Sequence, residues 1–167
     1  DNSNSDELDL IVHKYNNIKL IKSSKNLGYG KANNLAIKSA ITSFILIVNP
    51  DIILNVDSIN NLFKSFLKDP DNIGILGPSL YDKDMNRRTN GSKSYINQLK
   101  GLKVSNIPNN IPLDETCCEF LMGCCYLMKR DFFNILGGFD TNFFMYYEDC
   151  DLCDRSLQKN KYIMEVP

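Results

Sequence analysis

The chain has 167 residues and a mass of 19.0 kDa, which is the size of one ordinary domain. Apolar residues make up 43% and charged residues 23%, so the chain can build a hydrophobic core and does not have the composition of a disordered protein. Its 19 Lys and Arg residues are balanced by 20 Asp and Glu residues. This balance argues against a nucleic-acid-binding protein, because such proteins usually carry a basic excess.

The sequence contains no apolar run that approaches the ~20 residues of a membrane-spanning helix. Its opening residues, 1–6, are polar and unlike a secretion signal. Together with six cysteines, this pattern predicts reduced thiols and a cytoplasmic location.

Strand and helix patterns alternate along the chain, with connections too long for hairpins. In chain order we expect a strand at 18–22, a helix at 31–41, a strand at 44–48, a helix at 56–67, strands at 73–76 and 78–81, a strand-like stretch at 118–128, helices at 130–136 and 148–159, and a strand at 162–166. Such alternation is typical of right-handed crossovers in a largely parallel sheet. In open sheets of this kind, ligands bind beyond the carboxyl ends of the strands.

Three local features refine this expectation. Residues 44–48 are all apolar, which predicts a strand that is buried on both faces. Asp57 or Ser58 is placed to cap the helix that follows. The long polar segment 82–114 predicts a functional or mobile loop.

The motif Asn49-Pro50-Asp51 ends the most buried of the expected strands. A carboxylate at that position projects into the ligand crevice, where it could hold a divalent cation beside a diphosphate. Asn, Pro and Asp are also strong turn formers, so a simple turn explains the motif about equally well.

The densest part of the sequence runs from Gly137 to Arg155. It joins aromatic residues, among them Phe144 and Tyr146, to four carboxylates at positions 148, 149, 151 and 154. Acidic residues stabilise the first turn of a helix, and Asp151 is spaced for an ion pair with Arg155. Four acids in seven residues exceed what capping requires. A carboxylate beside aromatic surface and other acids suits a general base.

Two further patterns are weaker. The sequence Asn26-x-Gly28-x-Gly30 opens a helix, so its amides could approach a phosphate, although such a pattern is more often a turn. The cysteine pairs, including Cys150-x-x-Cys153, suggest a zinc or redox protein, but buried structural thiols explain them better.

Four motifs, taken in order and spacing, closely resemble those of family 2 glycosyltransferases, and the rhamnosyltransferase-like branch is the most similar. The motifs are Asp1-Asn2-Ser3-x-Ser5-Asp6, Asn26-Leu27-Gly28-Tyr29-Gly30 with Asn33-Asn34, Asn49-Pro50-Asp51, and Gly137-Gly138-Phe139-Asp140 followed by Phe144-Met145-Tyr146-Tyr147-Glu148-Asp149-x-Asp151-Leu152-Cys153-x-Arg155.

The resemblance implies an α/β fold of the GT-A type, a Rossmann-like three-layer α/β/α sandwich with a mostly parallel mixed sheet. It also implies inverting sugar transfer from a nucleotide-diphosphate sugar, with a dTDP- or UDP-sugar as donor, possibly of rhamnose, and Mg²⁺ or Mn²⁺ as cofactor. The expected acceptor is a saccharide or lipid-linked hydroxyl in polysaccharide synthesis for the cell envelope. Peripheral association with the inner face of the plasma membrane would follow from such an acceptor.

The resemblance also assigns roles to individual residues. Asp149 would be the catalytic base, and Asp51 would bind the metal that bridges the diphosphate. The residues expected to bind the nucleotide or cofactor are Asp1, Asn26, Gly28, Asn34, Asn49 and Asp51. Those expected to shape the substrate site are Asp140, Phe144, Tyr146, Glu148 and Asp151.

The chain also departs from the family pattern. The family's opening strand and helix do not precede Asp1, and the sequence stops at Pro167, before the place where many relatives supply a histidine near the metal. We therefore expect residues 1–167 to form a single glycosyltransferase domain that is truncated at its N-terminus and near its C-terminal end. A non-catalytic nucleotide- or carbohydrate-binding module, or an inactive fragment, is the alternative.

Overall fold

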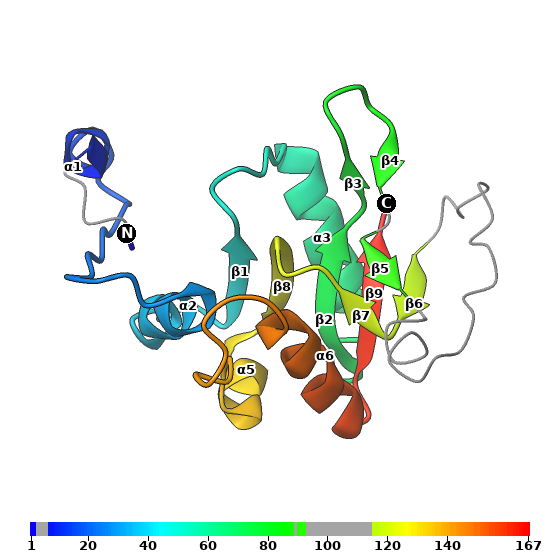
Figure 1. The fold of residues 1–167 in the computed structure, drawn as a ribbon. Coiled ribbons are helices and arrows are strands. Elements are labelled where there is room, and N and C mark those ends of the chain that lie inside the picture. Colours follow the sequence, from blue (N-terminus) through cyan, green and yellow to red (C-terminus); the bar gives the residue numbers. More distant parts are fainter. Residues whose placement is uncertain (3–6, 89, 93–114) are drawn as a thin grey trace.

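The computed structural model describes residues 1–2, 7–88, 90–92 and 115–167 (Figure 1). At its centre lies a five-stranded sheet, and its strands follow the spatial order β1-β8-β2-β9-β6. Their bounds are Phe44–Val48 for β1, Cys125–Lys129 for β8, Ile73–Pro78 for β2, Tyr162–Val166 for β9 and Thr116–Cys118 for β6.

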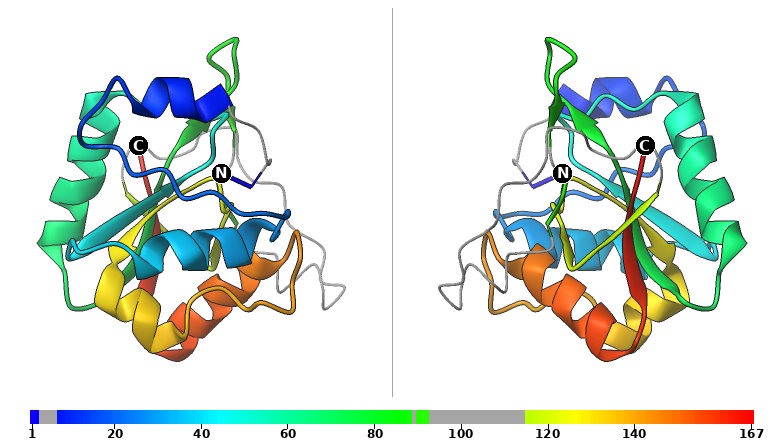
Figure 2. Two further views of the ribbon diagram at one scale, coloured as in Figure 1. Left: turned by 90° about the vertical axis from the view of Figure 1, so that its left-hand side faces the viewer. Right: turned by 90° about the vertical axis from the view of Figure 1, so that its right-hand side faces the viewer.

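Helices cover both faces of this sheet (Figure 2). On one face, α3 (Val56–Lys68) packs Leu62 and Phe66 against the sheet. The opposite face is covered by α2 (Tyr29–Lys38), α5 (Arg130–Leu136) and α6 (Glu148–Gln158). The result is the three-layer α/β/α arrangement that the sequence predicts.

Strand β8 shows why both faces need cover. Its side chains alternate, so that Cys125 and Leu127 join the cluster under α3, whereas Tyr126 and Met128 join the cluster under the other helices. These four side chains are all buried. A strand that is apolar at every position in this way can be stabilised only between two helical layers.

The expectation of a mostly parallel sheet is wrong. Among the described strands only β2 and β9 pair in parallel, whereas β8 pairs antiparallel with both β1 and β2, and β6 pairs antiparallel with β9. The crossover through α3 does make β1 and β2 run in the same direction, as the alternation predicts. However, β8 inserts between them, and strand patterns alone do not reveal which strands become neighbours.

The expected strand at 18–22 is also absent from the described structure. Around this segment the structure shows two hydrogen bonds to Asp1. Asp1 N donates to Ile21 O at 2.5 Å, and Ser23 N donates to Asp1 O at 3.0 Å. A strand requires a continued ladder of such bonds. The segment therefore runs without regular structure between α1 (Glu7–Val12) and α2.

Most other elements agree with the sequence patterns. The strands expected at 44–48 and 162–166 and the helix expected at 130–136 have the predicted bounds. The remaining short strands form two small pairs, β3 (Leu80–Tyr81) with β4 (Arg87–Arg88), and β5 (Gly91–Ser92) with β7 (Phe120–Leu121). Of the expected 82–114 loop, residues 82–88 and 90–92 are described and include β4 and β5, whereas 89 and 93–114 lie outside the described residues.

Within the described residues, no helix has the length and apolar character needed to cross a bilayer.

Helix α3 begins at Val56, as the sequence predicts, but a different residue caps it. Its cap is Asn55, whose side-chain oxygen accepts a hydrogen bond from Ser58 N at 2.7 Å, and neither Asp57 nor Ser58 caps the helix. Asn55 adopts the extended backbone conformation that a capping residue needs.

We predict that Asn55→Ala lowers the free energy of unfolding by about 1 kcal/mol, because the Ser58 amide loses its acceptor. Urea unfolding monitored by circular dichroism measures this loss. Ser58→Ala keeps that amide and is the matched control, with an expected change of less than about 0.5 kcal/mol. Equal losses in the two variants would contradict the cap assignment.

Candidate active site

The carboxyl ends of β1, β2 and β9 and the start of β8 lie at the same edge of the sheet. At this edge Asn49 N donates to Cys124 O at 2.9 Å, which fixes the segment after β1 against the turn before β8. Two residues further on, Asp51 is exposed to solvent. The Asn-Pro-Asp motif thus lies where ligands are expected to bind.

Asp149 approaches this edge from the first turn of α6. Its Oδ2 accepts a hydrogen bond from Gly123 N at 3.0 Å, and its Oδ1 accepts one from Cys150 N at 2.8 Å. The positive end of the helix dipole favours a carboxylate there. Gly123 directly precedes Cys124, so the same turn contacts both the Asn-Pro-Asp segment and Asp149.

The carboxylates of Asp51 and Asp149 both affect the pKa of the Cys124 thiol. Burial raises its pKa, and the negative charges of Asp51 and Asp149 raise it further. Both carboxylates therefore lie close enough to Cys124 to act on it electrostatically. The structure brings together the two acids to which the resemblance assigns the main chemistry.

Glu148 is buried, with only 5% of its surface exposed. Its Oε2 has no hydrogen-bond partner among the described residues. Burial raises the pKa of the Glu148 carboxyl, and the neighbouring charge of Asp149 adds to the shift. Glu148 is thus a buried acid with unused hydrogen-bonding capacity directly beside Asp149.

The segment before α6 exposes a group of large side chains. Phe144 is 56% exposed and Tyr146 is 73% exposed, and Met145 and Tyr147 are exposed to a similar degree. Tyr146 and Tyr147 both have positive φ angles, 70° and 71°, which is costly for residues with a side chain. Two consecutive residues of this kind directly before Glu148, the first residue of α6, indicate a backbone that its surroundings hold in place.

Helix α2 provides part of that support. Gly28, at φ +78°, lies so close to Phe144 that a Cβ atom would overlap the Phe144 carbonyl oxygen. The same oxygen accepts a hydrogen bond from Tyr29 N at 3.2 Å. Asn26 shapes the turn, because its Oδ1 accepts from Gly28 N at 2.9 Å. In this structure, Gly28 allows close packing between two protein segments.

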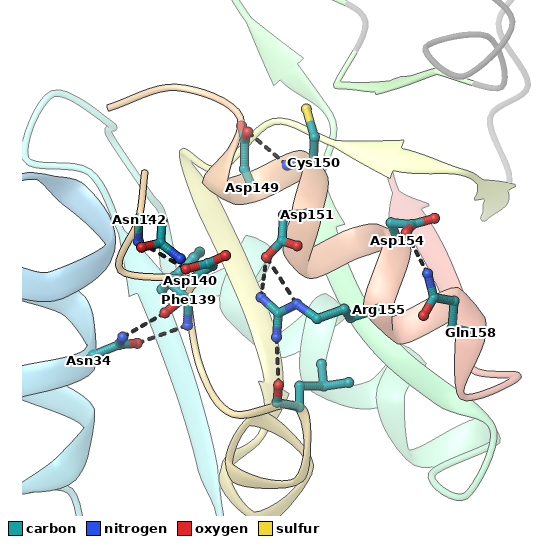
Figure 3. A network of polar contacts seen from close by, with 11 residues as sticks. Asn34, Phe139, Asp140, Asn142, Asp149, Cys150, Asp151, Asp154, Arg155 and Gln158 are labelled. Atoms are coloured by element: carbon teal, nitrogen blue, oxygen red, sulfur yellow. Dashed lines mark hydrogen bonds and ion pairs between the residues drawn. The ribbon is translucent and has the colours of Figure 1, made fainter. Parts of the chain in front are cut away.

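Asn34 holds the start of the same segment (Figure 3). Its Nδ2 donates to Phe139 O at 2.8 Å, and its Oδ1 accepts from Phe139 N at 2.9 Å. Next to Phe139, Asp140 accepts a hydrogen bond from Asn142 N at 2.9 Å and closes a turn. The contacts of Asn34 and Asp140 support the loop, and neither residue lies among the groups that the structure places around Cys124.

The acids of α6 point to different surroundings (Figure 3). Asp151 accepts a hydrogen bond from Arg155 Nε at 2.9 Å, and Arg155 also donates to Leu136 O at 2.6 Å. This is the ordinary ion pair that the spacing predicts, and it fastens α6 to the end of α5. Asp154 accepts from Gln158 at 2.6 Å on the exposed side of the helix.

Asn2 is a contributor that sequence reasoning did not single out. Its Oδ1 accepts from Leu27 N at 2.8 Å, and its Nδ2 donates to Asn26 Oδ1 at 2.8 Å. Asn2 thereby connects the first motif, which begins with Asp1, to the second. Its position beside Asp1 in the first of the four motifs was the available signal.

The described residues fit a divalent metal that binds together with its substrate. Asp51 offers a carboxylate, the kind of ligand that Mg²⁺ and Mn²⁺ prefer, and no group of three or more potential ligands occurs among the described residues. Mg²⁺ is commonly held by one or two carboxylates plus substrate phosphates.

A zinc site built on the cysteines is not supported. Burial raises the pKa of Cys118, Cys125 and Cys153 to about 12, and no group of three or more Cys, His, Asp or Glu side chains placed to bind a metal occurs among the described residues. The three side chains lie in the hydrophobic core instead.

Comparison with known families and structures shows which proteins this chain is similar to. The model of glycosyl transferase family 2 matches residues 1–136. The chain belongs to this family of glycosyltransferases.

Curated relatives agree with this assignment. An N-acetylglucosaminyl-diphospho-decaprenol L-rhamnosyltransferase of Mycobacterium tuberculosis is 28% identical over 86% of this chain and 54% of its own length. A rhamnosyltransferase of Escherichia coli is 28% identical over 93% of this chain and 63% of its own. A hexosyltransferase of low-salt glycan biosynthesis from Haloferax volcanii is 26% identical over 96% and 52%. The chain thus spans about half the length of the curated relatives it matches.

Among solved structures, GalNAc-T7 in complex with UDP, GalNAc and Mn²⁺ aligns with 96% of this chain and 32% of its own, with a TM-score of 0.70 and 16% identity. At this identity the likeness concerns the fold alone. Together with the family assignment, it confirms the α/β fold of the GT-A type.

The packing of Gly28 leads to a prediction with a natural control. Gly28→Ala should lower the free energy of unfolding by about 3 kcal/mol or more, because a strained backbone is combined with overlap of the Phe144 carbonyl. Gly137→Ala should cost only about 1 kcal/mol, because Gly137 also has a positive φ, +85°, but has open space around it. Urea unfolding measures both losses. Equal losses would contradict the close packing of Phe144 on Gly28.

The burial of Glu148 predicts a pH-dependent effect on stability. Because the folded state raises the pKa of Glu148, the contribution of Glu148 to the free energy of unfolding falls as the pH rises from about 4 through the folded-state pKa. Glu148→Gln removes this cost and should raise Tm by about 2–4 °C at pH 7, with no gain at pH 4. Scanning calorimetry measures the shift. The exposed control Asp154→Asn should give no such gain, and a gain from Glu148→Gln that is independent of pH would contradict the assignment.

Proposed function

We propose that this chain is the catalytic domain of an inverting glycosyltransferase. It transfers a sugar from a nucleotide-diphosphate donor to an acceptor hydroxyl by a single displacement, with Asp149 as the base. The observation that carries the proposal is that the Gly123-Cys124 turn, at the carboxyl edge of the sheet, binds both Asp149 and the backbone of Asn49, two residues before Asp51. Asp51 is exposed to solvent and can bind a ligand, whereas Asp149 is held by two backbone hydrogen bonds.

Asp149 has the properties that a base needs. Two backbone N–H groups hold its carboxylate in one orientation and leave further lone pairs for an acceptor hydroxyl. As the acceptor oxygen bonds to the anomeric carbon, its proton passes to Asp149, and the bond from the anomeric carbon to the nucleoside diphosphate breaks. Glu148, buried behind Asp149, shapes this part of the site.

Asp51 would hold the donor end of the site. Its exposed carboxylate follows β1, and Asn49 anchors the preceding backbone to Cys124. A bound Mg²⁺ or Mn²⁺ supplies a Lewis acid that neutralises charge on the diphosphate. We propose that Asp1, with Asn26 nearby, lies toward the nucleotide, because Asn2 connects the two segments.

The exposed side chains before α6 provide a surface for a sugar ring. Sugars present apolar C–H faces, and large exposed aromatic groups such as Phe144 and Tyr146 can pack against them. Their position in the segment that leads into α6 would bring a hydroxyl of the bound sugar toward Asp149.

The relatives suggest the substrates. Two of them are named as rhamnosyltransferases, and one name specifies a lipid-diphosphate acceptor. We therefore propose a dTDP- or UDP-sugar as donor, with rhamnose as the first sugar to test, and a polysaccharide or lipid-linked acceptor at the inner face of the cell membrane. Cell-envelope polysaccharide synthesis is the corresponding process.

The full-length protein is tested by incubation with Mn²⁺ and either dTDP-L-rhamnose or UDP-glucose, with release of the nucleoside diphosphate as the readout. Asp149→Asn should lower turnover at least about 100-fold, because general base catalysis typically contributes that much or more. Asp154→Asn, on the exposed side of the same helix, should retain wild-type turnover.

Calorimetry with UDP and dTDP, with and without Mn²⁺, completes this test. Metal-dependent binding that Asp51→Asn removes would support the donor site. Nucleotide binding without turnover of either donor would instead favour a non-catalytic binding module, and wild-type turnover by Asp149→Asn would refute its role as the base.

A further inference from the structure

Tyr29, the first residue of α2, contacts both segments that flank Asp149. Its backbone N–H donates to Phe144 O at 3.2 Å, in the segment that leads into α6. Its hydroxyl donates to Gly123 O, in the turn that precedes β8. Its ring packs edge-on against Phe139, with ring centroids 5.5 Å apart. One side chain thus connects α2, the loop before α6 and the turn before β8.

Gly123 is held from both directions. The Tyr29 hydroxyl donates to the carbonyl oxygen of Gly123, and the N–H of Gly123 donates to Asp149 Oδ2 at 3.0 Å. A Cβ atom at Gly123 would lie 3.0 Å from the Cβ of Asp149, so the turn and the base approach each other as closely as packing allows. Because glycine has the greatest backbone freedom of any residue, the orientation of this N–H depends on what fixes its neighbouring peptide.

We propose that the Tyr29 hydroxyl is a positioning group for Asp149, acting through Gly123. Tyr29 holds the Gly123 carbonyl, the fixed glycine directs its N–H at Oδ2, and that bond sets the orientation of the carboxylate toward the acceptor. The inference rests on the proposed role of Asp149 as the base. The bond between Tyr29 and Phe144, a residue proposed to face the sugar, is made by the Tyr29 backbone N–H and does not involve the hydroxyl.

The hydroxyl suits this role because it keeps its proton. Burial raises the pKa of Tyr29 above its usual range, and the charges of Asp149 and Glu148 raise it further. At neutral pH the phenol therefore acts as a donor to the Gly123 carbonyl. A phenylalanine at position 29 would keep the ring contact with Phe139 and the backbone bond to Phe144, and would lose only the hydroxyl.

The first experiment needs no substrate. In the full-length protein, Tyr29→Phe should speed hydrogen exchange of the Gly123 amide at least about threefold, as measured by NMR, because the glycine loses one of its two restraints. Tyr126→Phe is the matched control. The Tyr126 hydroxyl also donates to a backbone carbonyl, that of Leu121 in β7, and not to that of Gly123. Unchanged exchange at Gly123 in Tyr29→Phe would overturn the inference.

The second experiment is a double-mutant cycle on donor turnover with dTDP-L-rhamnose or UDP-glucose and Mn²⁺. Tyr29→Phe should lower kcat about three- to tenfold, with the KM for the donor unchanged, and should have no further effect in the Asp149→Asn background. Tyr126→Phe should leave kcat unchanged even where it lowers Tm.

The outcomes separate the two proposals. Equal fold-losses from Tyr29→Phe in the wild-type and Asp149→Asn backgrounds would show that Tyr29 does not act through Asp149, and the inference would fail while the role of Asp149 stands. Full activity in Asp149→Asn alone would instead refute the base, whatever the exchange measurement gives.

Discussion

The hydrogen bond from Gly123 N to Asp149 is the contact on which the arrangement of the site depends. It joins the start of α6 to the turn that contains Gly123 and Cys124. The carbonyl of Cys124 in the same turn binds the backbone N–H of Asn49, directly after β1. Asp149 and the segment that carries Asp51, about a hundred residues apart in the chain, thereby adjoin the same turn. Without this contact, Asp51 and Asp149 would belong to separate parts of the surface.

Close packing on the start of α2 supports the same contact from the other side. Gly28 allows the carbonyl of Phe144 to approach, and Asn34 holds the backbone of Phe139 with both ends of its amide. The loop between them carries the two positive φ angles at Tyr146 and Tyr147. Gly28, which belongs to the turn that the sequence suggests for a phosphate, therefore packs here against the loop that precedes α6.

Local patterns were sufficient for much of this fold. Runs such as 44–48 and the helical period of α3 identify their elements, because each follows from burial of one segment. The position of β8 between β1 and β2 could not be predicted, because it depends on contacts between distant segments. The pairing of Tyr29 with Gly123 is hidden for the same reason, whereas the ion pair of Asp151 with Arg155 is local and follows from its spacing.

The central claim is that a nucleotide and its metal bind between Asp51 and Asp149. Paramagnetic broadening by Mn²⁺ in the presence of UDP, measured on the ¹⁵N-labelled full-length protein, tests this claim most directly, with Mg²⁺ as the diamagnetic reference. The account predicts selective broadening of the amide signals of Asp51, Gly123 and Cys124, while Leu10 in α1 keeps its signal. Broadening confined to another surface, such as the crevice beside Lys64 and Lys68 on α3, would contradict it.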